Sequence, residues 1–503
     1  MLRGSGPDLF LLRRLHEPLG YANGQAAYFL LGFWPLAAVA ERARNALLAG
    51  GALGAAALLA ALVLLSQSRA AIAALIVVAG VMLVVVPGRR RRAWALLVVA
   101  AGVAAGSGPL LAVFEQPVDP TLVPVPVVRQ AAGASLLLAL GVAAVWAVVR
   151  WVVGAVTSRS PRSARPLGLA SGGVLVAAGV VGIVFLAGLV GNPAERVANQ
   201  YREFTQLQPQ TGGESRFSSG GGNRFEYWRI ALNQFEAAPV RGLGAGNFER
   251  TYFLQRRITE AVTQPHSLEI QALAELGLIG GLAVAIFVVG VLIGFGRRAL
   301  AGRRNAGDAG LAVAGGGAFL AWLVQTSVDW LHLIPGVTAV AVCAGAVLVA
   351  PWAGRRPLIS GSRSTRAVVI LCAALVAFAA VQLGRSTLAD LNRQQAREAL
   401  ESGDPARALN ESNEALALDE ESLRSWYLKA AAYARRNDYV AARAALGEAV
   451  GREPNNFVTW TLLGDLATRR GDLDQATRDY ARALALNPRD PGLAALLRRA
   501  RAG

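Results

Sequence analysis

Hydrophobic residues along this chain are grouped into long runs that short polar stretches separate. Runs of about 18–23 residues recur, and this length is enough for an α-helix to cross the hydrocarbon core of a bilayer. The pattern therefore predicts an all-α fold, a polytopic transmembrane bundle of about ten helices. The expected helices are 24–41, 46–65, 69–86, 93–113, 130–150, 167–190, 269–295, 310–330, 334–351 and 366–384.

A long polar segment, residues 191–268, interrupts these runs. Its residues 212–222 are rich in Gly and Ser, which predicts a flexible hinge. After the hinge, apolar side chains recur near i, i+3, i+7 and i+10, and this spacing predicts an amphipathic helix that Pro239 ends. The apolar side chains are Phe225, Trp228, Leu232 and Phe235. Such a helix either lies on the membrane surface with its arginines at headgroup level, or packs on the bundle with solvated arginines.

Past residue 390 the composition changes to that of soluble helices, and a period of 34 residues appears. The period resembles the tetratricopeptide repeat, in which small residues let two helices of a hairpin approach closely. We expect about three repeats, the first of which (390–419) lacks the aromatic residue and caps the array or joins the last membrane helix. Such arrays are docking surfaces for proteins. The periodic positions are Gly403, Asn437 and Gly471; Asp404, Asp438 and Asp472; Ala408, Ala442 and Ala476; Ala415, Ala449 and Ala483; Trp426 and Trp460; Pro454 and Pro488.

The composition and charge agree with a membrane protein. Of 503 residues, 54% are hydrophobic and 17% are charged, and the net charge is +17. The basic residues form short clusters in alternate connections between the apolar runs, as cytoplasmic loops do. No basic helix or stacking platform appears, so we do not expect nucleic-acid binding. Cys343 and Cys372 both lie inside apolar runs and indicate neither a disulfide framework nor a zinc site.

The alternation of basic clusters also orients the chain. It places the 191–268 loop and the C-terminal repeats outside the cytoplasm. Residues 1–22, an N-terminal tail without a signal-peptide core, fall outside as well, although they are basic. Either this tail is translocated or helices are missing before it, and we favour the second interpretation. The expected domains are the 1–22 tail, a 23–385 transmembrane domain that includes the outer loop, and a 390–503 repeat domain.

The outer loop carries the candidate chemistry. His266 lies where the polar loop gives way to an apolar helix, and Arg224, Arg229 and Arg241 precede it. A neutral imidazole accepts a proton from a hydroxyl, and guanidinium groups bind a pyrophosphate through paired hydrogen bonds. A plain interfacial histidine is the simpler alternative. No second histidine or cysteine is near enough in sequence to suggest a metal site, and nothing suggests a cofactor.

Other polar residues have two interpretations each. Arg241 begins the segment Arg-Gly-Leu-Gly-Ala-Gly-Asn, whose alternate glycines form either a tight turn, which we favour, or a backbone nest for an anion. Arg69 opens an apolar helix on the outer side, where it meets an anion or extends to the interface. Asp329 and His332 lie at the outer end of the 310–330 run, where they orient His266, bind a sugar, or cap a turn.

Several of these residues resemble the signature of the O-antigen ligase and polymerase superfamily of bacterial membrane glycosyltransferases. The resemblance spans roughly residues 18–350, and members normally carry further helices before its first piece. The matching pieces are Gly20-Tyr-Ala-Asn23-Gly-Gln-Ala26, Gln67-Ser68-Arg69-Ala70, Arg224 to Trp228 with Pro239 and Gly242-x-Gly244, His266-Ser267 with Gly277-Leu-Ile-Gly280, and Ser327 to Pro335.

The resemblance implies a metal-independent glycosyltransferase that needs no cofactor. It would transfer a glycan from an undecaprenyl-pyrophosphate carrier to a hydroxyl of a glycan, lipid or protein acceptor at the outer face of the bacterial inner membrane. It casts His266, Arg224 and Arg69 as catalytic residues. His266 would engage the acceptor hydroxyl, and the two arginines would hold the pyrophosphate. We expect Arg241, Arg229, Asp329 and His332 to bind substrate, and the repeats to bind a protein partner.

Two functions from other classes remain possible. A transporter or flippase of a lipid-linked or small substrate tends to carry buried ionisable groups at mid-bilayer, whereas the central parts of these runs are nearly free of charge. A membrane-tethered scaffold would use the bundle only as an anchor, and ten helices with a large loop exceed that need. The scarcity of charge at the centre of the runs and the size of the bundle therefore favour an enzyme over a transporter and over a scaffold.

Overall fold

The computed structural model describes residues 6–115, 123–159, 198, 202, 223–350 and 363–502. These residues are almost entirely helical, which confirms the predicted all-α class. The chain divides into two units, and each is described by itself. The membrane unit comprises Met1–Gly246 and Gln264–Ala350, and the repeat unit comprises Asn247–Thr263 and Pro351–Gly503. The expected helix 167–190 and the 212–222 hinge lie outside the described residues.

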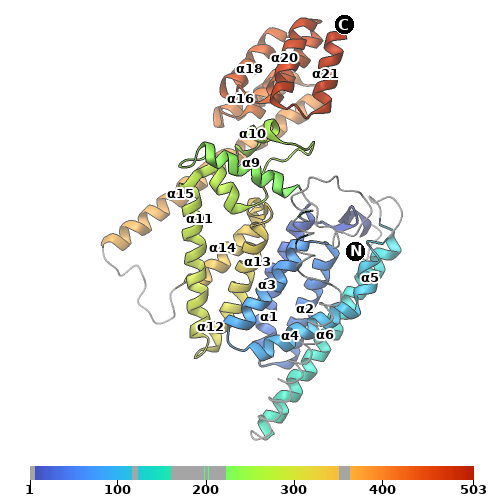
Figure 1. Cartoon of the computed structure of the whole chain (residues 1–503), viewed down its shortest axis with the longest axis vertical. Coiled ribbons are helices and arrows are strands. Elements are labelled where there is room, and N and C mark those ends of the chain that lie inside the picture. Colours follow the sequence, from blue (N-terminus) through green and yellow to red (C-terminus); the bar gives the residue numbers. More distant parts are fainter. Residues whose placement is uncertain are drawn as a thin grey trace. The chain divides into compact units, whose positions relative to one another are not determined.

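The membrane unit begins with a short turn and a hairpin, followed by the helical bundle (Figure 1). Its hydrophobic core is built mainly from α1, α2, α3 and α13, with Trp34, Leu53 and Phe319 fully or almost fully buried. The elements are η1 (Gly6–Leu9), β1 (Phe10–Leu11), β2 (Arg14–Leu15), α1 (Ala22–Arg42), α2 (Ala46–Leu65), α3 (Arg69–Val85), α4 (Arg89–Ala105), α5 (Ser107–Leu111), α6 (Val125–Arg159), α9 (Arg224–Ala237), α11 (Leu268–Ala301), α12 (Ala306–Leu311), η3 (Ala312–Gly316), α13 (Gly317–Thr326), η4 (Leu331–Leu333) and α14 (Pro335–Val349).

Several expected helices differ from the structure in where they break or end. The run 93–113 is two helices, because α4 ends at Ala105 and α5 starts after Gly106. The run 310–330 starts earlier, contains the π turn η3 and ends at Thr326. The run 366–384 is not a separate helix, because α15 continues through it to Glu401. Apolar composition marks the presence of a helix but does not mark breaks within it.

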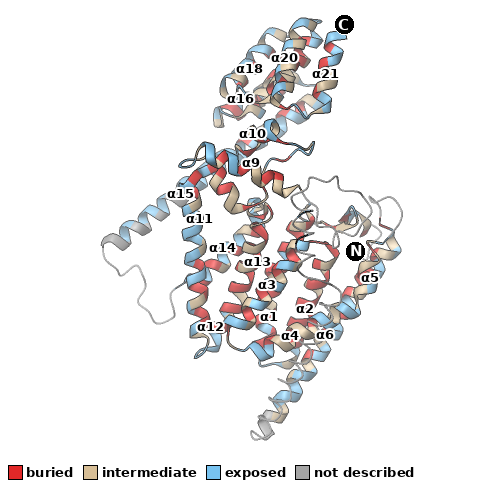
Figure 2. Cartoon of the chain, in the orientation of Figure 1, coloured by how far each residue is buried: buried red, intermediate tan, exposed pale blue. Residues whose placement is uncertain are grey.

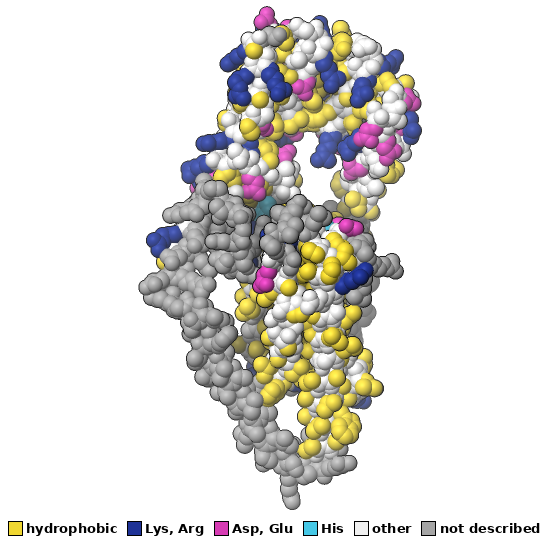
Figure 3. All heavy atoms as spheres, turned by 90° about the vertical axis from the view of Figure 1, so that its right-hand side faces the viewer, with side chains coloured by type: hydrophobic (Ala, Val, Ile, Leu, Met, Phe, Trp, Pro, Cys, Tyr) yellow, Lys and Arg dark blue, Asp and Glu magenta, His cyan; other side chains and the backbone are white. Residues whose placement is uncertain are grey.

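The described helices include four that are long and apolar enough to cross a membrane: Ala46–Leu65, Val125–Val156, Leu268–Ala301 and Ala306–Thr326. Helices α6 and α11 turn apolar side chains outward, and Leu137, Leu282 and Ile286 are each more than 60% exposed. Figure 2 shows these exposed faces, and in Figure 3 the helices of the membrane unit present mostly hydrophobic side chains. Exposed apolar surface of this extent is expected where lipid is the solvent. The chain is a multi-pass membrane protein.

At one end of the bundle, arginines of α4 and α6 bind the C-terminal end of α1. The buried Arg92 pairs with the buried Glu41 at 2.9 Å. Arg91 donates to the Glu41 carbonyl, and Arg150 donates to the carbonyls of Glu41 and Ala43. The last carbonyls of a helix lack partners and carry partial negative charge, so cations stabilise them. The basic residues Arg91, Arg92 and Arg150, which the sequence pattern places in connections, lie at the start of α4 and within α6, and they stabilise the end of α1.

Replacing Glu41 by Ala is expected to destabilise the bundle by about 3–5 kcal/mol, because it leaves the Arg92 charge buried without its partner. The measurement is thermal unfolding of the purified protein in detergent or nanodiscs. Arg90→Ala serves as the control, since Arg90 is exposed. Equal melting temperatures for Glu41→Ala and the native chain would contradict the role of this ion pair.

The repeat unit is an array of helical hairpins, and its turns explain the 34-residue period. Gly403, Asn437 and Gly471 all have positive φ, between 59° and 79°, a conformation that Gly and Asn tolerate best. The aspartate that follows each of them caps the next helix by accepting a backbone N–H bond. The helices are α10 (Phe248–Gln255), α15 (Arg363–Glu401), α16 (Pro405–Leu418), α17 (Leu423–Arg435), α18 (Tyr439–Arg452), α19 (Phe457–Arg469), α20 (Leu473–Leu486) and α21 (Pro491–Ala502).

Candidate functional site

The buried carboxylate of Asp329 joins three separate parts of the membrane unit. It follows α13 and is fully buried. It accepts hydrogen bonds from the Tyr21 hydroxyl at 2.8 and 2.9 Å, from Asn23 Nδ2 at 2.7 Å and from Arg224 Nη2 at 3.3 Å. The Tyr21 ring also stacks on Trp330, with centroids 4.6 Å apart. The start of α1, the end of α13 and the start of α9 therefore meet at one carboxylate.

This network positions the Arg224 guanidinium. A buried carboxylate needs an opposite charge and hydrogen-bond donors, and Arg224 with Tyr21 and Asn23 supplies them. Burial, together with the Asp329 charge, raises the pKa of Tyr21, which keeps its hydroxyl protonated as a donor. The Arg224 side chain remains 31% exposed. Asp329 thus binds the Arg224 guanidinium at Nη2 while part of the side chain stays accessible.

Arg69 lies at the same end of the bundle. It is the first residue of α3, its side chain is exposed, and the preceding Ser68 caps the helix by accepting from the Ala71 N–H. Arg14, on the N-terminal hairpin, donates to the Ser66 carbonyl at 3.0 Å and to Asn23 Oδ1 at 2.7 Å. Arg14 thus connects the turn before Arg69 to the residues around Asp329.

His266 precedes α11 and has the positive φ of 58°. Its ring lies 5.3 Å from the ring of Tyr227, on the same helix α9 that carries Arg224. Its Nδ1 is 3.1 Å from the Gln264 carbonyl. A carbonyl only accepts, so in the neutral ring Nδ1 carries the hydrogen and Nε2 carries the lone pair. This is the tautomer that a proton acceptor at Nε2 requires.

His332 has a different environment. Its Nε2 lies 2.9 Å from Gln271 Oε1, and its Nδ1 lies 3.0 Å from the Thr326 hydroxyl. Burial lowers its pKa to about 4, so it is neutral near pH 7. With both ring nitrogens engaged, His332 links the end of α13 to the first turns of α11. Glu269 adds to this link by accepting from the Ser327 hydroxyl at 2.7 Å.

The lowered pKa of His332 predicts acid sensitivity. The folded state keeps the ring neutral down to about pH 4, whereas the unfolded state takes up a proton near pH 6.5. The stability that the neutral His332 contributes to the folded state is therefore fully present above about pH 6.5. It is lost as the pH falls from there to about 4. We expect the melting temperature of the native chain to fall more steeply across this window than that of His332→Asn. Parallel curves for the two proteins would contradict this assignment.

The glycine-rich turn that starts at Arg241 is bonded into a break in α11. Gly277 has φ 65° and ψ −159°, so the helix ladder is interrupted there. The Leu243 and Gly244 N–H groups donate to the Ala274 and Glu275 carbonyls. In return, the N–H groups that follow Gly277 donate to the Pro239 and Val240 carbonyls. These donors are occupied, which supports the tight turn over the anion nest, and Arg241 itself is exposed.

Helix α9 packs through the face opposite its expected apolar stripe. The stripe, Phe225, Trp228, Leu232 and Phe235, is half-buried or exposed, and Leu232 is 43% exposed. The buried residues are Glu226, Tyr227, Ile230, Ala231 and Gln234, and the helix contacts α11. The buried Glu226 is neutralised by Arg229 through hydrogen bonds of 2.8 and 2.9 Å.

The structure thus brings Arg224 and Asp329 into contact and places His266 beside the helix of Arg224. Arg229 forms an ion pair with Glu226 instead. His332 is held by the hydrogen bonds that link the end of α13 to α11. Sequence reasoning did not select Tyr21 and Asn23 as site residues, although it noted their motif. The signal was available, because two polar residues directly precede or open an apolar helix, where an unpaired polar group is costly.

Comparisons with known proteins agree with the resemblance stated above. Residues 128–285 match the family model described as O-antigen ligase. Residues 399–466 and 458–490 match two models of the tetratricopeptide repeat. The suspected resemblance is therefore confirmed for these regions, an O-antigen ligase region followed by C-terminal tetratricopeptide repeats. A search of the curated proteins found no match.

Among solved structures, the chain is similar to one described as the crystal structure of the APC/C hetero-tetramer Cut9–Hcn1. The identity is 18%, the TM-score is 0.23, and the match covers 50% of this chain and 51% of that chain. This chain therefore covers about half the length of that structure.

Proposed function

Because the chain carries an O-antigen ligase region followed by tetratricopeptide repeats, we propose that it transfers a glycan from an undecaprenyl-pyrophosphate carrier to an acceptor hydroxyl. The match to the O-antigen ligase model supports the enzyme class, a membrane glycan ligase or polymerase. The donor, the metal independence of the reaction and the place of the site at the outer face of the bacterial inner membrane are parts of this proposal. The repeats, which imply protein–protein interaction, then lie outside the cytoplasm as well.

In the proposed reaction, the Nε2 lone pair of His266 accepts the proton of the acceptor hydroxyl. The acceptor oxygen forms a bond to the anomeric carbon of the glycan while the bond from that carbon to the pyrophosphate oxygen breaks. The polyprenyl pyrophosphate leaves with the bonding electron pair, and Arg224 and Arg69 stabilise its charge. The observation that carries the proposal is the pairing of a His266 tautomer suited to a base with an Arg224 that Asp329 holds in place.

The other candidate residues have supporting roles in this proposal. Asp329 orients Arg224 and so acts on the pyrophosphate indirectly. His332 holds the first turns of α11 near the glycan, and the exposed Arg241 meets the donor at the membrane surface. Arg229 is compensated by Glu226 and therefore contributes hydrogen bonds rather than net charge.

A transporter would require its ionisable groups at a different depth in the membrane. A substrate path across the bilayer needs ionisable side chains at mid-membrane. Within the described residues, the network around Asp329 lies where α1 and α9 begin and α13 ends, and the Glu41–Arg92 pair lies at the opposite end of α1. This distribution supports chemistry at one surface over transport through the bundle.

The proposal is tested with the purified chain in nanodiscs, a labelled undecaprenyl-pyrophosphate oligosaccharide and three acceptor classes: glycan, lipid and protein. We expect labelled product with one class, in the presence of a chelator. Polymerisation of the donor alone would identify a polymerase. Movement of the donor between leaflets without any transfer to an acceptor would contradict the proposal and support the flippase.

A further inference from the structure

A segment of the polar loop belongs to the repeat unit rather than to the membrane unit. Residues Asn247–Thr263, which contain α10, cluster with the C-terminal repeats, although more than 100 residues separate them in sequence. The chain enters this segment directly after Gly246 and leaves it three residues before His266. The loop segment therefore behaves as a ligand of the array that is covalently attached to the membrane unit at both ends.

The segment is folded by its own contacts. The rings of Phe248 and Tyr252 are fully buried and stacked, with centroids 5.3 Å apart. The Tyr252 hydroxyl donates to the Glu260 carbonyl at 2.9 Å. Arg256 Nη1 donates to the carbonyls of Thr259 and Glu260 at 2.8 and 2.9 Å. These bonds close the stretch after α10 into a compact loop, so less conformational entropy is lost when the loop binds the array.

Three contacts of different kinds attach the segment to the array. Arg256 Nη2 donates to Asn487 Oδ1, at the end of α20, over 2.7 Å, and Arg256 is 5% exposed. The ring of Phe253 meets the ring of Phe457 edge-on, with centroids 4.9 Å apart. Arg250 pairs with Glu453 at 2.6 Å. A buried guanidinium and an aromatic pair are the kinds of contact that dominate protein interfaces, whereas the exposed ion pair adds specificity.

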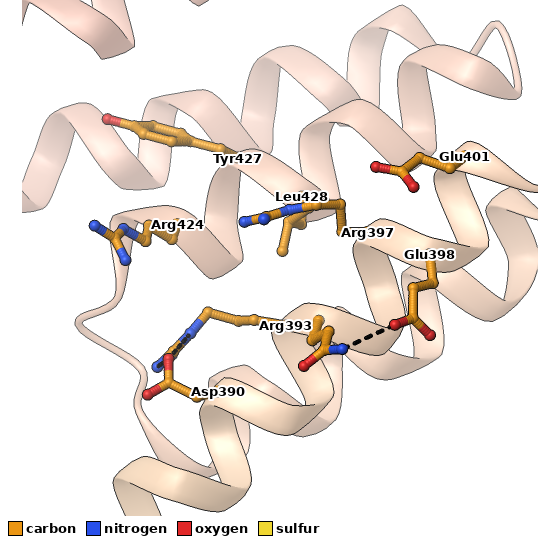
Figure 4. Close-up of a pocket in the computed structure, with 9 residues that line it drawn as sticks. Asp390, Arg393, Arg397, Glu398, Glu401, Arg424, Tyr427 and Leu428 are labelled. Atoms are coloured by element: carbon orange, nitrogen blue, oxygen red, sulfur yellow. Dashed lines mark hydrogen bonds and ion pairs between the residues drawn. The ribbon is translucent and has the colours of Figure 1, made fainter. Parts of the chain in front are cut away.

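The segment also approaches the first helices of the array. Burial raises the pKa of Glu249 on α10, and the Glu453 carboxylate adds to this effect, whereas Arg424 on α17 opposes it. Arg424 and Tyr427 line a groove of about 650 Å³ between α15 and α17, which Arg397 and Glu401 also line (Figure 4). Glu249 on α10 therefore interacts electrostatically with Arg424 on α17 as well as with Glu453 in the connection between α18 and α19.

We propose that the repeat array is the receptor for this chain's own segment Asn247–Thr263, and that by holding the segment it restrains the stretch that leads into His266. The segment supplies the buried Arg256, the aromatic Phe253 and the charged Arg250, and the array supplies the partner of each. The repeats then act on the loop within one chain. The docking stands on these contacts alone, whereas its consequence for transfer rests on the proposed function.

The test is amide hydrogen exchange of the full-length protein in nanodiscs, read by mass spectrometry, with no substrate present. In the native chain, peptides from 247–263 exchange slowly. In Asn487→Ala, which removes the acceptor for Arg256, and in Phe457→Ala, we expect exchange of these peptides to rise at least tenfold. Peptides that contain residues 264–267 should follow them. Asn455→Ala is the matched control, because Asn455 bonds Arg482 within the array.

A charge exchange separates lost docking from a damaged array. Arg250→Glu and Glu453→Arg are each expected to speed exchange of the segment, and the double variant should restore part of the native protection. Unchanged exchange of 247–263 in Asn487→Ala and Phe457→Ala would overturn the docking. Unchanged exchange of 264–267, with 247–263 released, would overturn the restraint of His266. Neither result depends on whether the chain transfers a glycan.

Discussion

His266→Ala is expected to lower the rate of glycan transfer by about 10²–10⁴-fold, the range that a positioned general base contributes. The substitution removes the Nε2 lone pair that the Gln264 carbonyl orients, while Asp329 still holds Arg224. The donor should therefore still bind. The measurement is product formation under single-turnover conditions, alongside a separate binding assay with labelled donor.

The chain offers a matched control for this substitution. It has three histidines, and His16 lies on the N-terminal segment next to Glu17. His16→Ala is expected to keep the native transfer rate. Added imidazole should restore part of the activity of His266→Ala, because a small base can occupy the vacated space, whereas a purely structural loss would not respond to it. Full activity in His266→Ala would exclude this residue as the base.

Much of this architecture is readable from the sequence, because it depends on local chemistry. The predicted helix 46–65 matches α2 residue for residue, since a bilayer fixes the length of an apolar run. The 34-residue period identifies the repeats, because Gly403, Asn437 and Gly471 occupy equivalent left-handed turns. His266 and Arg224 stand out because charged or polar groups gather in a single loop between apolar segments.

The remainder depends on contacts between distant residues, which no local pattern contains. In the sequence, Asp329 fits a turn cap and a site residue equally well. The hydrogen bonds that it accepts from Tyr21 and Arg224 identify it as part of the site network. The docking of Arg256 on Asn487 joins residues 231 positions apart. Pattern reasoning finds the elements, and long-range polar pairing decides how they combine.

Gly277→Ala is expected to disrupt the membrane unit more than the substitution of other glycines on α11. At φ 65° and ψ −159°, Gly277 occupies a region of backbone space that is essentially restricted to glycine, and a side chain there costs about 1–3 kcal/mol. An added Cβ would also overlap the Val240 carbonyl, and reciprocally a Cβ on Gly242 would overlap that of Glu275. The turn and the broken helix approach so closely that neither backbone tolerates a side chain.

The cost extends beyond the overlap because four backbone hydrogen bonds cross this junction. A buried donor or acceptor left without a partner costs about 1–3 kcal/mol, and a bilayer supplies no water to replace it. We therefore expect a sharp fall in folded yield and in melting temperature, measured by size-exclusion chromatography and thermal unfolding in detergent. Gly290→Ala is the control on the same helix, because a Cβ there meets no atom within 4 Å. Gly242→Ala should reproduce the defect, and the double variant should be little worse than either single variant, because both break the same junction. Additive losses would show that the two glycines serve separate structures.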